Sequence, residues 1–383
     1  MIRAAPARGT ISARLPSLRR PVSSRGPGTG AEGVHTTMQA ARFGYCVPMF
    51  ANPGAAFFRV PGATTLDPVA VVNAAVEAEA LGFDSVWTAD HLMHGDDGGI
   101  MEGWTTLSVI AGKTSRVQLG TIHMAQPFRA PALVAKMAGT LDALSGGRLI
   151  FFYDAGWQEP EVRAYGLDWP DEEERIARMD EGLTLIDALW RAEEPLNFDG
   201  RYFHTVDAAC RPKPAQKPRP PVWLGESKSQ LWNDTIVRHA DGWNSTPASP
   251  ARFAEKLAGI HEACRRIGRD PSTLDLSLEI QILVAPTEDE VRATALKIAD
   301  LPPSRRGVPR TALVDALRGP NPPRVADVVD DWIVGTPDDV IQQLGVYRDL
   351  GVSHFMLWFI DYPSMNGPRL FAERVMPALR GDA

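Results

Sequence analysis

Eight short apolar runs alternate with amphipathic helical segments after residue 41, which predicts an α/β protein folded as a closed (β/α)8 TIM barrel. No Gly-x-Gly-x-x-Gly pattern follows the first run, and this argues against an open, doubly wound sheet. The 383 residues are 44% hydrophobic and 23% charged, as in ordinary globular proteins. Barrels of this class routinely use about 250 residues or more as one domain, so we expect a single barrel domain over residues 38–383.

Residues 1–37 differ in composition from the rest of the chain. They are rich in Pro, Gly, Ser and Ala and lack an apolar period, so they cannot bury enough apolar surface to offset the entropy of ordering. Two interpretations stay open: a disordered leader that resembles a transit peptide, or a start assigned too early, with Met38 as the true initiator. We favour the second, and both place the segment outside the fold. The first 40 residues hold one acid, Glu32, and six arginines: Arg3, Arg8, Arg14, Arg19, Arg20 and Arg25.

The first four βα units are predicted from apolar runs and helix signals. Asp67 and Pro68 supply an N-cap and an N1 proline for a helix that Gly82 ends. Acidic residues in the first turn favour a long helix from Glu172, because the helix N-terminus carries a partial positive charge. We expect strands over 42–49, 83–90, 116–124 and 148–156, and helices over 68–81, near 105–113, over about 132–144 and over 172–190.

The last four units follow the same alternation. Thr336 and Pro337 are a cap and an N1 proline for a helix that ends at Gly351. We expect strands over 221–227, 242–246, 274–285 and 352–359, and helices from Gln230, after Pro250, from Pro337 and in the last segment, up to about Arg380.

Two insertions interrupt the βα repeat. Residues 196–207 are predicted as a hairpin after the fourth unit, with Asp199 and Gly200 as its turn. Residues 301–323, after the seventh strand, contain six prolines and no apolar period, so we expect a loop that closes over the site as a lid.

Charge, hydropathy and cysteine content exclude several classes of partner. A net charge of −7 argues against nucleic acid, whose phosphates need a basic face. No run of 18 apolar residues is present, so we expect no membrane span. Cys46, Cys210 and Cys264 form no CxxC pair and are odd in number, so we expect structural cysteines and a cytoplasmic protein.

Polar residues at the predicted strand ends are the candidate functional groups, because barrel active sites are built there. Asp90 and His91 follow the second strand, and Asp154 and Trp157 follow the fourth. His91 has three open interpretations: a metal ligand, a histidine with a structural partner, or a proton donor beside a cofactor ring. We predict catalytic roles for Asp90, His91 and Trp157, with Trp157 stacking on the ring; the other strand-associated tryptophans are expected in the core.

The loop after the fifth strand is a candidate phosphate site. Gly225, Ser227, Lys228 and Ser229 precede a predicted helix, whose N-terminal backbone N–H groups, together with two hydroxyls and an ammonium, suit a phosphate. A serine at a helix start is most often only a cap, so this signal is weak by itself.

The sequence resembles the luciferase-like superfamily of flavin- or coenzyme F420-dependent oxidoreductases over about residues 38–379. Each motif is weak singly, but their order and spacing are specific. They are AEALGFDSVWTADH (78–91), WTTLSVIAGKTSRVQLGT (104–121), PALVAKMAGTLDALSGGRL (131–149), AGWQEPEVRAYG (155–166), ADGWN (240–244) and VGTPDDV (334–340).

The resemblance implies a barrel, often dimeric, that binds reduced FMN or coenzyme F420 with Asp90 and His91 beside the ring. It also implies a bend, often a non-proline cis peptide, near Ile122 and His123, and a phosphate at the 225–229 loop. Two departures stand out. Glu226 replaces a glycine and would repel phosphate unless it turns away, and Trp157 replaces the glutamate of F420-dependent sugar-phosphate dehydrogenases. The implied cofactor-binding set is Asp90, His91, Ile122, His123, Asp154, Gly225, Ser227, Lys228 and Ser229.

Two related functions are compatible with this resemblance. The first is a monooxygenase that uses reduced FMN and dioxygen on a small organic substrate, served by a separate flavin reductase. The second is hydride transfer with coenzyme F420. Trp157 favours the first and the local resemblance favours the second.

Rivals of other classes are a metal-dependent barrel hydrolase and an inactive flavin-binding paralogue. The hydrolase would use Asp90, His91, His94 and Asp96 as ligands. We expect no metal in the site of the oxidoreductase, and we expect a homodimer.

Overall fold

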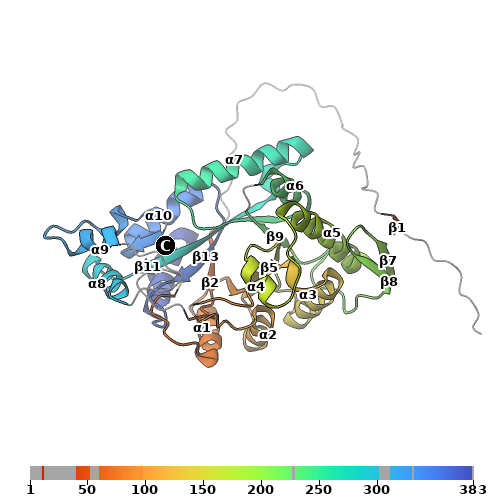
Figure 1. Ribbon diagram of the computed structural model, residues 1–383. Coiled ribbons are helices and arrows are strands. Elements are labelled where there is room, and N and C mark those ends of the chain that lie inside the picture. Colours follow the sequence, from red (N-terminus) through yellow and green to blue (C-terminus); the bar gives the residue numbers. More distant parts are fainter. Residues whose placement is uncertain are drawn as a thin grey trace, which may run out of the picture.

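The computed structural model describes residues 11–12, 40–51, 60–95, 97–226, 229–301, 311–329 and 332–381. Within them, parallel strands form a nearly closed barrel with helices around it (Figure 1). All eight predicted strands are present, so the expected TIM barrel is confirmed. They are β2 (Arg42–Cys46), β3 (Ser85–Ala89), β4 (Gln118–Ile122) with β5 (Met124–Ala125), β6 (Phe151–Asp154), β9 (Val222–Gly225), β10 (Gly242–Ser245), β11 (Asp275–Val284) and β13 (His354–Phe359).

Strand pairing brings the two ends of this series together. The hydrogen-bonded order is β4-β3-β2-β13-β11-β10-β9-β6-β5. Because β4 and β5 are parts of one predicted strand, the pairing of β5 with β6 and a parallel bridge between Leu119 and Leu149 complete the circle. A further parallel strand, β12 (Trp332–Gly335), pairs with the far end of β11 and was not predicted.

The predicted helices are also present. Asp67 caps α1 (Pro68–Ala80), since its Oδ1 accepts the N–H groups of Val69 and Ala70, both at 3.0 Å. The other predicted helices are α2 (Gly103–Lys113), α3 (Pro131–Ser145), α5 (Glu172–Arg191), α6 (Gln230–His239), α7 (Pro250–Ile267), α10 (Pro337–Asp349) and the C-terminal run of α11 (Asn366–Leu370), η4 (Phe371–Val375) and α12 (Met376–Arg380). Short helices not predicted are α4 (Glu159–Ala164), α8 (Glu288–Ala299), η1 (Gln126–Phe128), η2 (Pro271–Thr273) and η3 (Val325–Asp327).

Tryptophan side chains fill the barrel interior below the site. The rings of Trp87 and Trp223 stack with centroids 5.5 Å apart, and both side chains are buried. Glycine makes room for them, because a Cβ at Gly120 would lie 2.1 Å from the Trp87 ring and one at Gly242 would lie 2.4 Å from Trp223 Nε1. The barrel interior is therefore packed with side chains, and the active sites of such barrels lie at the C-terminal ends of the strands.

The predicted hairpin is formed by β7 (Leu196–Asp199) and β8 (His204–Ala208), with one correction to its turn. Asp199 still pairs with His204, and the turn spans 200–203, where Gly200 N donates to Phe203 O at 3.0 Å. The reason is Glu181 of α5, whose carboxylate accepts the N–H groups of residues 201–203 and holds the longer turn. Within the N-terminal segment only β1 (Ile11–Ser12) is described, and it pairs with β7.

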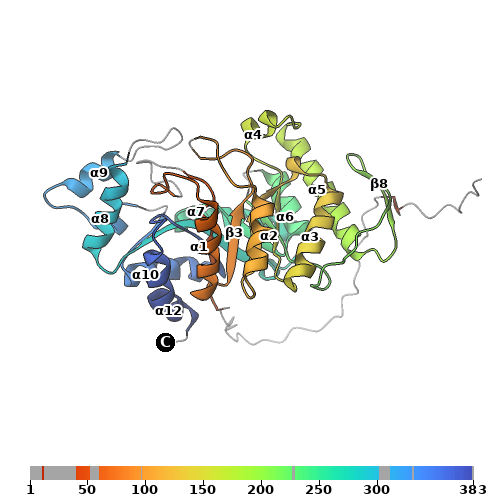
Figure 2. The same cartoon turned by 90° about the horizontal axis from the view of Figure 1, so that it is seen from below.

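The insertion after β11 is not wholly a loop, which corrects the second expectation. Residues 302–310 lie outside the described part, but α9 (Thr311–Arg318) is helical. Leu313 and Leu317 are four residues apart in the sequence, a helical spacing that the surrounding prolines obscured. Leu317 is buried in a second apolar cluster with residues of α8, η3 and β12. Figure 2 places this α8–α9 lobe at one end of the molecule and the hairpin at the other.

Candidate cofactor and active site

A cavity of about 450 Å³ lies at the C-terminal ends of the barrel strands. The structure brings five of the predicted site residues to its wall: His91, Ile122, His123, Asp154 and Trp157. They follow three different strands, β3, β4 and β6, as the barrel topology requires. The volume falls within the range of about 300–1,000 Å³ that is usual for small-molecule sites.

His91 is held by a carboxylate that the sequence did not indicate. Its Nδ1 lies 2.7 Å from Glu161 Oε1, and Glu161 Oε2 accepts the N–H groups of Leu92 and Met93 at 2.7 and 2.9 Å. An ionised carboxylate can only accept hydrogen bonds, so Nδ1 of His91 carries the proton. Nε2 is then the atom with a free lone pair for chemistry in the cavity.

A second histidine on the same cavity is arranged in the same way. The predicted non-proline cis peptide joins Ile122 and His123 and separates β4 from β5. His123 Nδ1 lies 2.9 Å from Asp154 Oδ2, while Asp154 Oδ1 accepts the N–H of Gly156 at 2.6 Å. Among the described residues, nothing donates to the buried Nε2 of His123. This atom can therefore accept a hydrogen bond from a ligand or a water.

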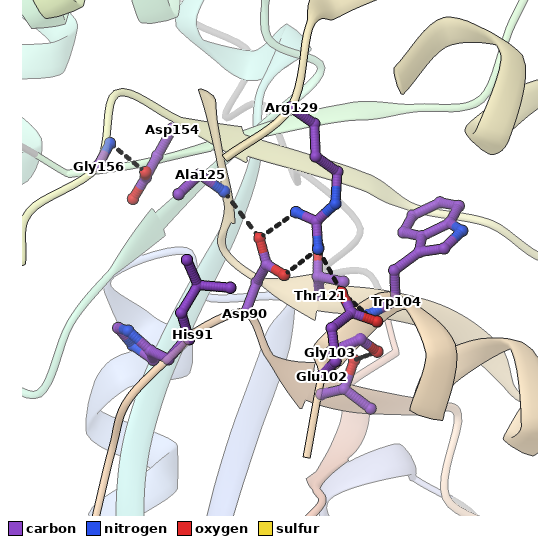
Figure 3. A network of polar contacts seen from close by, with 12 residues as sticks. Asp90, His91, Glu102, Gly103, Trp104, Thr121, Ala125, Arg129, Asp154 and Gly156 are labelled. Carbon is purple, nitrogen blue, oxygen red and sulfur yellow. Dashed lines mark hydrogen bonds and ion pairs between the residues drawn. The ribbon is translucent and has the colours of Figure 1, made fainter. Parts of the chain in front are cut away.

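Asp90 lies beside the cavity within a network of charges (Figure 3). Arg129 donates two hydrogen bonds to its carboxylate, from Nη1 to Oδ2 at 2.8 Å and from Nη2 to Oδ1 at 2.9 Å. The N–H of Ala125 also donates to Oδ2, at 3.0 Å. Arg129 also pairs with Glu102. Burial lowers the pKa of Arg129, but the two carboxylates outweigh it and raise that pKa. Both oxygens of Asp90 are thus engaged, so its carboxylate ties β3 to β5 and positions His91.

The loop after β9 contains a neutralised carboxylate. Glu226 lies 2.7 Å from the ammonium of Lys256 and accepts hydrogen bonds from Ser245 and Thr246 at 3.0 and 2.5 Å. The anticipated clash between Glu226 and a phosphate is therefore reduced. Ser229 Oγ caps α6 by accepting the N–H of Trp232 at 3.3 Å. Gly225 borders His123, whereas Ser227 and Lys228 lie outside the described residues.

Trp157 and Arg175 form part of the cavity wall beyond the two histidines. The indole of Trp157 is 61% exposed and meets the His91 ring edge-on, with centroids 5.4 Å apart. Arg175 of α5 lies over the Trp169 ring at 3.9 Å, and burial lowers its pKa. Arg175 is the kind of group that binds an acidic substituent, and it lies too far from any motif for the sequence to indicate it.

Glu279 is a second acid that the sequence did not single out. It lies in the middle of β11, is fully buried, borders the cavity and accepts the indole N–H of Trp358 at 2.7 Å. The available signal was an acid between two apolar residues of the predicted strand, Leu278 and Ile280, since a buried carboxylate is costly unless it has a role.

Neither metal ligation nor a membrane span has support in the described chain. No three His, Cys, Asp or Glu side chains among the described residues are grouped to hold a metal ion. Asp96, one ligand of the hydrolase hypothesis, lies outside them. Over the same residues, every helix is too short or too polar to cross a bilayer.

A closed parallel barrel with a ligand-sized cavity and two carboxylate-held histidines at its C-terminal end defines a TIM-barrel enzyme. The profile of the family described as luciferase-like monooxygenase matches residues 51–354. The chain belongs to this luciferase-like family, and it is an oxidoreductase.

Relatives and solved structures show what the chain is similar to. An F420-dependent glucose-6-phosphate dehydrogenase of Intrasporangium calvum is 32% identical over 335 residues, covering 82% of this chain and 96% of that protein. One of Microbacterium testaceum is 29% identical over 325 residues, covering 82% and 94%. An F420-dependent secondary alcohol dehydrogenase superposes with a TM-score of 0.67 at 22% identity, covering 89% and 99%. Monooxygenase RslO1 of Streptomyces bottropensis superposes with a TM-score of 0.69 at 23% identity, covering 88% and 99%.

Proposed function

We propose that this protein transfers a hydride between coenzyme F420 and a small alcohol or carbonyl substrate. The observation that carries the proposal is the pair of carboxylate-held histidines on one cavity, His91 and His123, in a chain whose matched relatives are F420-dependent dehydrogenases. Alcohol oxidation needs a base for the hydroxyl proton beside a hydride acceptor, and an oriented neutral imidazole is such a base.

The described residues fit a flavin-type ring. The unpartnered Nε2 of His123 faces a cavity of adequate volume, and a ring N–H is a suitable donor to it. Gly225 lies against the same imidazole, where a bare backbone lets a planar ring approach closely. Coenzyme F420, when bound, would accept or supply the hydride. Its phosphate would be held near Ser229 and Arg175, with Ser227 and Lys228 as predicted further contacts.

His91 has the geometry of the proton acceptor. The hydrogen bond of Glu161 to Nδ1 fixes the tautomer that leaves Nε2 free, and the negative charge of Glu161 stabilises the imidazolium that forms when a substrate hydroxyl gives up its proton. Trp157 stands edge-on to this ring at the cavity mouth. We propose that Trp157 packs against the substrate and limits the access of water to His91.

Monooxygenation with reduced FMN and dioxygen is the second candidate function. It is favoured by the absence of a carboxylate at Trp157, where the resemblance places the acid of F420-dependent sugar-phosphate dehydrogenases. Dioxygen and a separate flavin reductase would then be the partners of the protein.

An anaerobic turnover assay with F420 and FMN, each offered in turn with a panel of small alcohols, tests the proposal. We expect reduction of F420 at a rate that air does not change, and a loss of about 10²–10⁴-fold in kcat for His91→Gln. The matched control is His204→Gln, because His204 pairs with Asp199 at 2.9 Å in the same way but on the exposed hairpin. Turnover that requires reduced FMN and dioxygen would replace the proposal with monooxygenation.

A further inference from the structure

A second cavity of the described chain lies away from the candidate active site. Its volume is about 630 Å³, and it shares no lining residue with the cavity of His91 and His123. It lies where the C-terminal ends of β11 and β13 meet α8 and α11, between the barrel and the α8–α9 lobe. The proposed hydride transfer uses no residue of this cavity.

One buried carboxylate in this cavity is only half satisfied. Asp361 follows β13, and its Oδ2 accepts the N–H of Gly367 at 3.0 Å. Its Oδ1 is buried, and no described residue donates to it. A Cβ at Gly367 would lie 2.8 and 2.9 Å from the two oxygens, so only glycine lets the start of α11 approach this closely. A buried acceptor without a partner costs about 1–3 kcal/mol, so a structural role alone does not account for Asp361.

The remaining walls are mainly apolar. Leu283, Ile298 and Ile360 are buried and line the cavity together with Val284 of β11 and Leu370 of α11. In the part of the chain that the structure describes, the further charged groups in its lining are Glu290 and Lys297, both of α8. Among the described residues, no ion pair joins Lys297 to Asp361. The cavity therefore offers a hydrocarbon surface and one carboxylate oxygen that lacks a donor.

We propose that this cavity binds a small organic cation, a primary ammonium carried by an apolar group. The ammonium would donate a hydrogen bond to Asp361 Oδ1, and the hydrocarbon part would replace water against the aliphatic walls. A carboxylate ligand would meet Asp361 and Glu290, whose two negative charges outweigh the one positive charge of Lys297, and is excluded. A neutral alcohol would supply one donor but no charge, so it binds more weakly than the amine of the same chain length.

Isothermal titration calorimetry of the whole protein with n-hexylammonium, n-hexanol and hexanoate at pH 7.5 tests this site. We expect saturable binding of n-hexylammonium at one site, binding of n-hexanol weaker by about tenfold or more, and none of hexanoate. Charge-assisted hydrogen bonds are about twice as strong as neutral ones, so Asp361→Asn should weaken n-hexylammonium by about tenfold or more. Equal binding of the amine and the alcohol, or no saturable amine binding, overturns the proposal.

Two matched variants distinguish binding in this cavity from binding elsewhere on the protein. Asp289→Asn removes a carboxylate that is 93% exposed on the same α8 helix and should leave binding unchanged. Thr294→Phe fills the cavity from α8 and should abolish binding of n-hexylammonium while Asp361 stays in place. Far-ultraviolet circular dichroism verifies that each variant is folded. Retention of full affinity by Asp361→Asn, or by folded Thr294→Phe, places the amine elsewhere and refutes the site.

Discussion

At the residue scale, the histidines of the active-site cavity owe their orientation to partners far along the chain. His91 and Glu161 are 70 residues apart, and His123 and Asp154 are 31 apart. Each carboxylate is itself held by backbone N–H groups, so each imidazole has one fixed tautomer and one nitrogen available. Two such nitrogens on one cavity suit proton transfer beside a ring cofactor.

Replacement of Glu161 tests the orientation of His91. Glu161→Gln keeps the shape but removes the charge that stabilises imidazolium, and an amide N–H can favour the wrong tautomer. We expect kcat to fall by about 10²–10⁴-fold, because the imidazole of His91 would lose the carboxylate that fixes its orientation and tautomer. Asp199→Asn, on the exposed His204 pair, is the control. An unchanged kcat would rule out this role of Glu161.

Asp361 gives a pH dependence of stability that can be measured without any ligand. Burial raises its pKa from 3.8 to about 6. The folded protein therefore binds this proton more tightly than the unfolded chain, and stability falls as the pH rises from about 4 to 6. Above that range, Asp361→Asn should be more stable than the wild type by about 3 kcal/mol, with the difference vanishing near pH 4. Urea unfolding at several pH values measures the free energy of unfolding of both proteins. If this free energy changed with pH in the same way for the wild type and for Asp361→Asn, the prediction would be wrong.

Most of the residues that the sequence singles out as candidates lie around one cavity, but the sequence did not indicate their partners. Asp90, His91, Ile122, His123, Asp154 and Trp157 were picked from strand ends and from the resemblance, and the structure brings them together. Glu161, Arg129 and Glu279 were missed because their partners lie 70, 39 and 79 residues away, which leaves no local pattern. Arg175 was missed because it lies outside every motif. Only the fold brings such groups into contact.

At the element scale, the loop after β9 and the helix α7 share one ion pair. Glu226 lies in the loop at the cavity wall, and Lys256 lies in the middle of α7. Without the ammonium, the carboxylate would face the place where the resemblance puts a phosphate. This pairing explains how a glutamate is tolerated where a glycine is usual.

A double-mutant cycle tests that interpretation. Lys256→Met should raise the Kd for F420 about tenfold, roughly 1.4 kcal/mol, because Glu226 then repels the phosphate. Adding Glu226→Gln should restore most of the affinity, and Glu226→Gln alone should change it little. Fluorescence titration with oxidised F420 measures all four proteins. If the double variant bound F420 as weakly as the summed effects of the two single variants predict, Lys256 would contact the cofactor directly.

The prediction of elements succeeded where a segment had its own capping residue and N1 proline. Asp67 and Pro68 fixed the start of α1, and Thr336 and Pro337 fixed that of α10. It failed at β12 and α9, which are stable only because they pack on α8 and on the far end of β11. The helix α9 lies inside a proline-rich stretch and β12 has only four residues, so neither has a periodicity long enough to identify it.

At the scale of the whole molecule, the predicted homodimer has a candidate surface on neighbouring helices α2 and α3. Val109, Leu133 and Leu144 are 47%, 53% and 82% exposed there, beside an apolar groove of about 530 Å³ between the helices. Exposed apolar surface of this kind is typical of an interface, and a two-fold dimer would bury the same face on both copies.

Sedimentation of the purified protein tests this expectation. We expect a dimer, and we expect Val109→Glu with Leu144→Glu to yield a folded monomer, since two charges would enter the apolar contact. Val206→Glu is the control, because Val206 is 84% exposed on the distant β8. A dimer that survives both glutamates would place the interface on another face.

The barrel as a whole could be predicted from alternation alone, but its two cavities could not. The positions of cavities depend on how loops from several strands pack, and the lid expected over residues 301–323 falls partly on residues 302–310, outside the described chain. Side-chain packing between distant segments, and not local pattern, decides where such cavities form.

A crystal structure of the protein with oxidised F420 would show directly whether the two histidines flank the cofactor. We expect the tricyclic ring to lie in the cavity of about 450 Å³, within hydrogen-bonding distance of His123 Nε2 and with His91 Nε2 open to a substrate beside it. Density for the ring in the cavity of Asp361, or a complex that forms with FMN and never with F420, would contradict the proposed hydride transfer at this site.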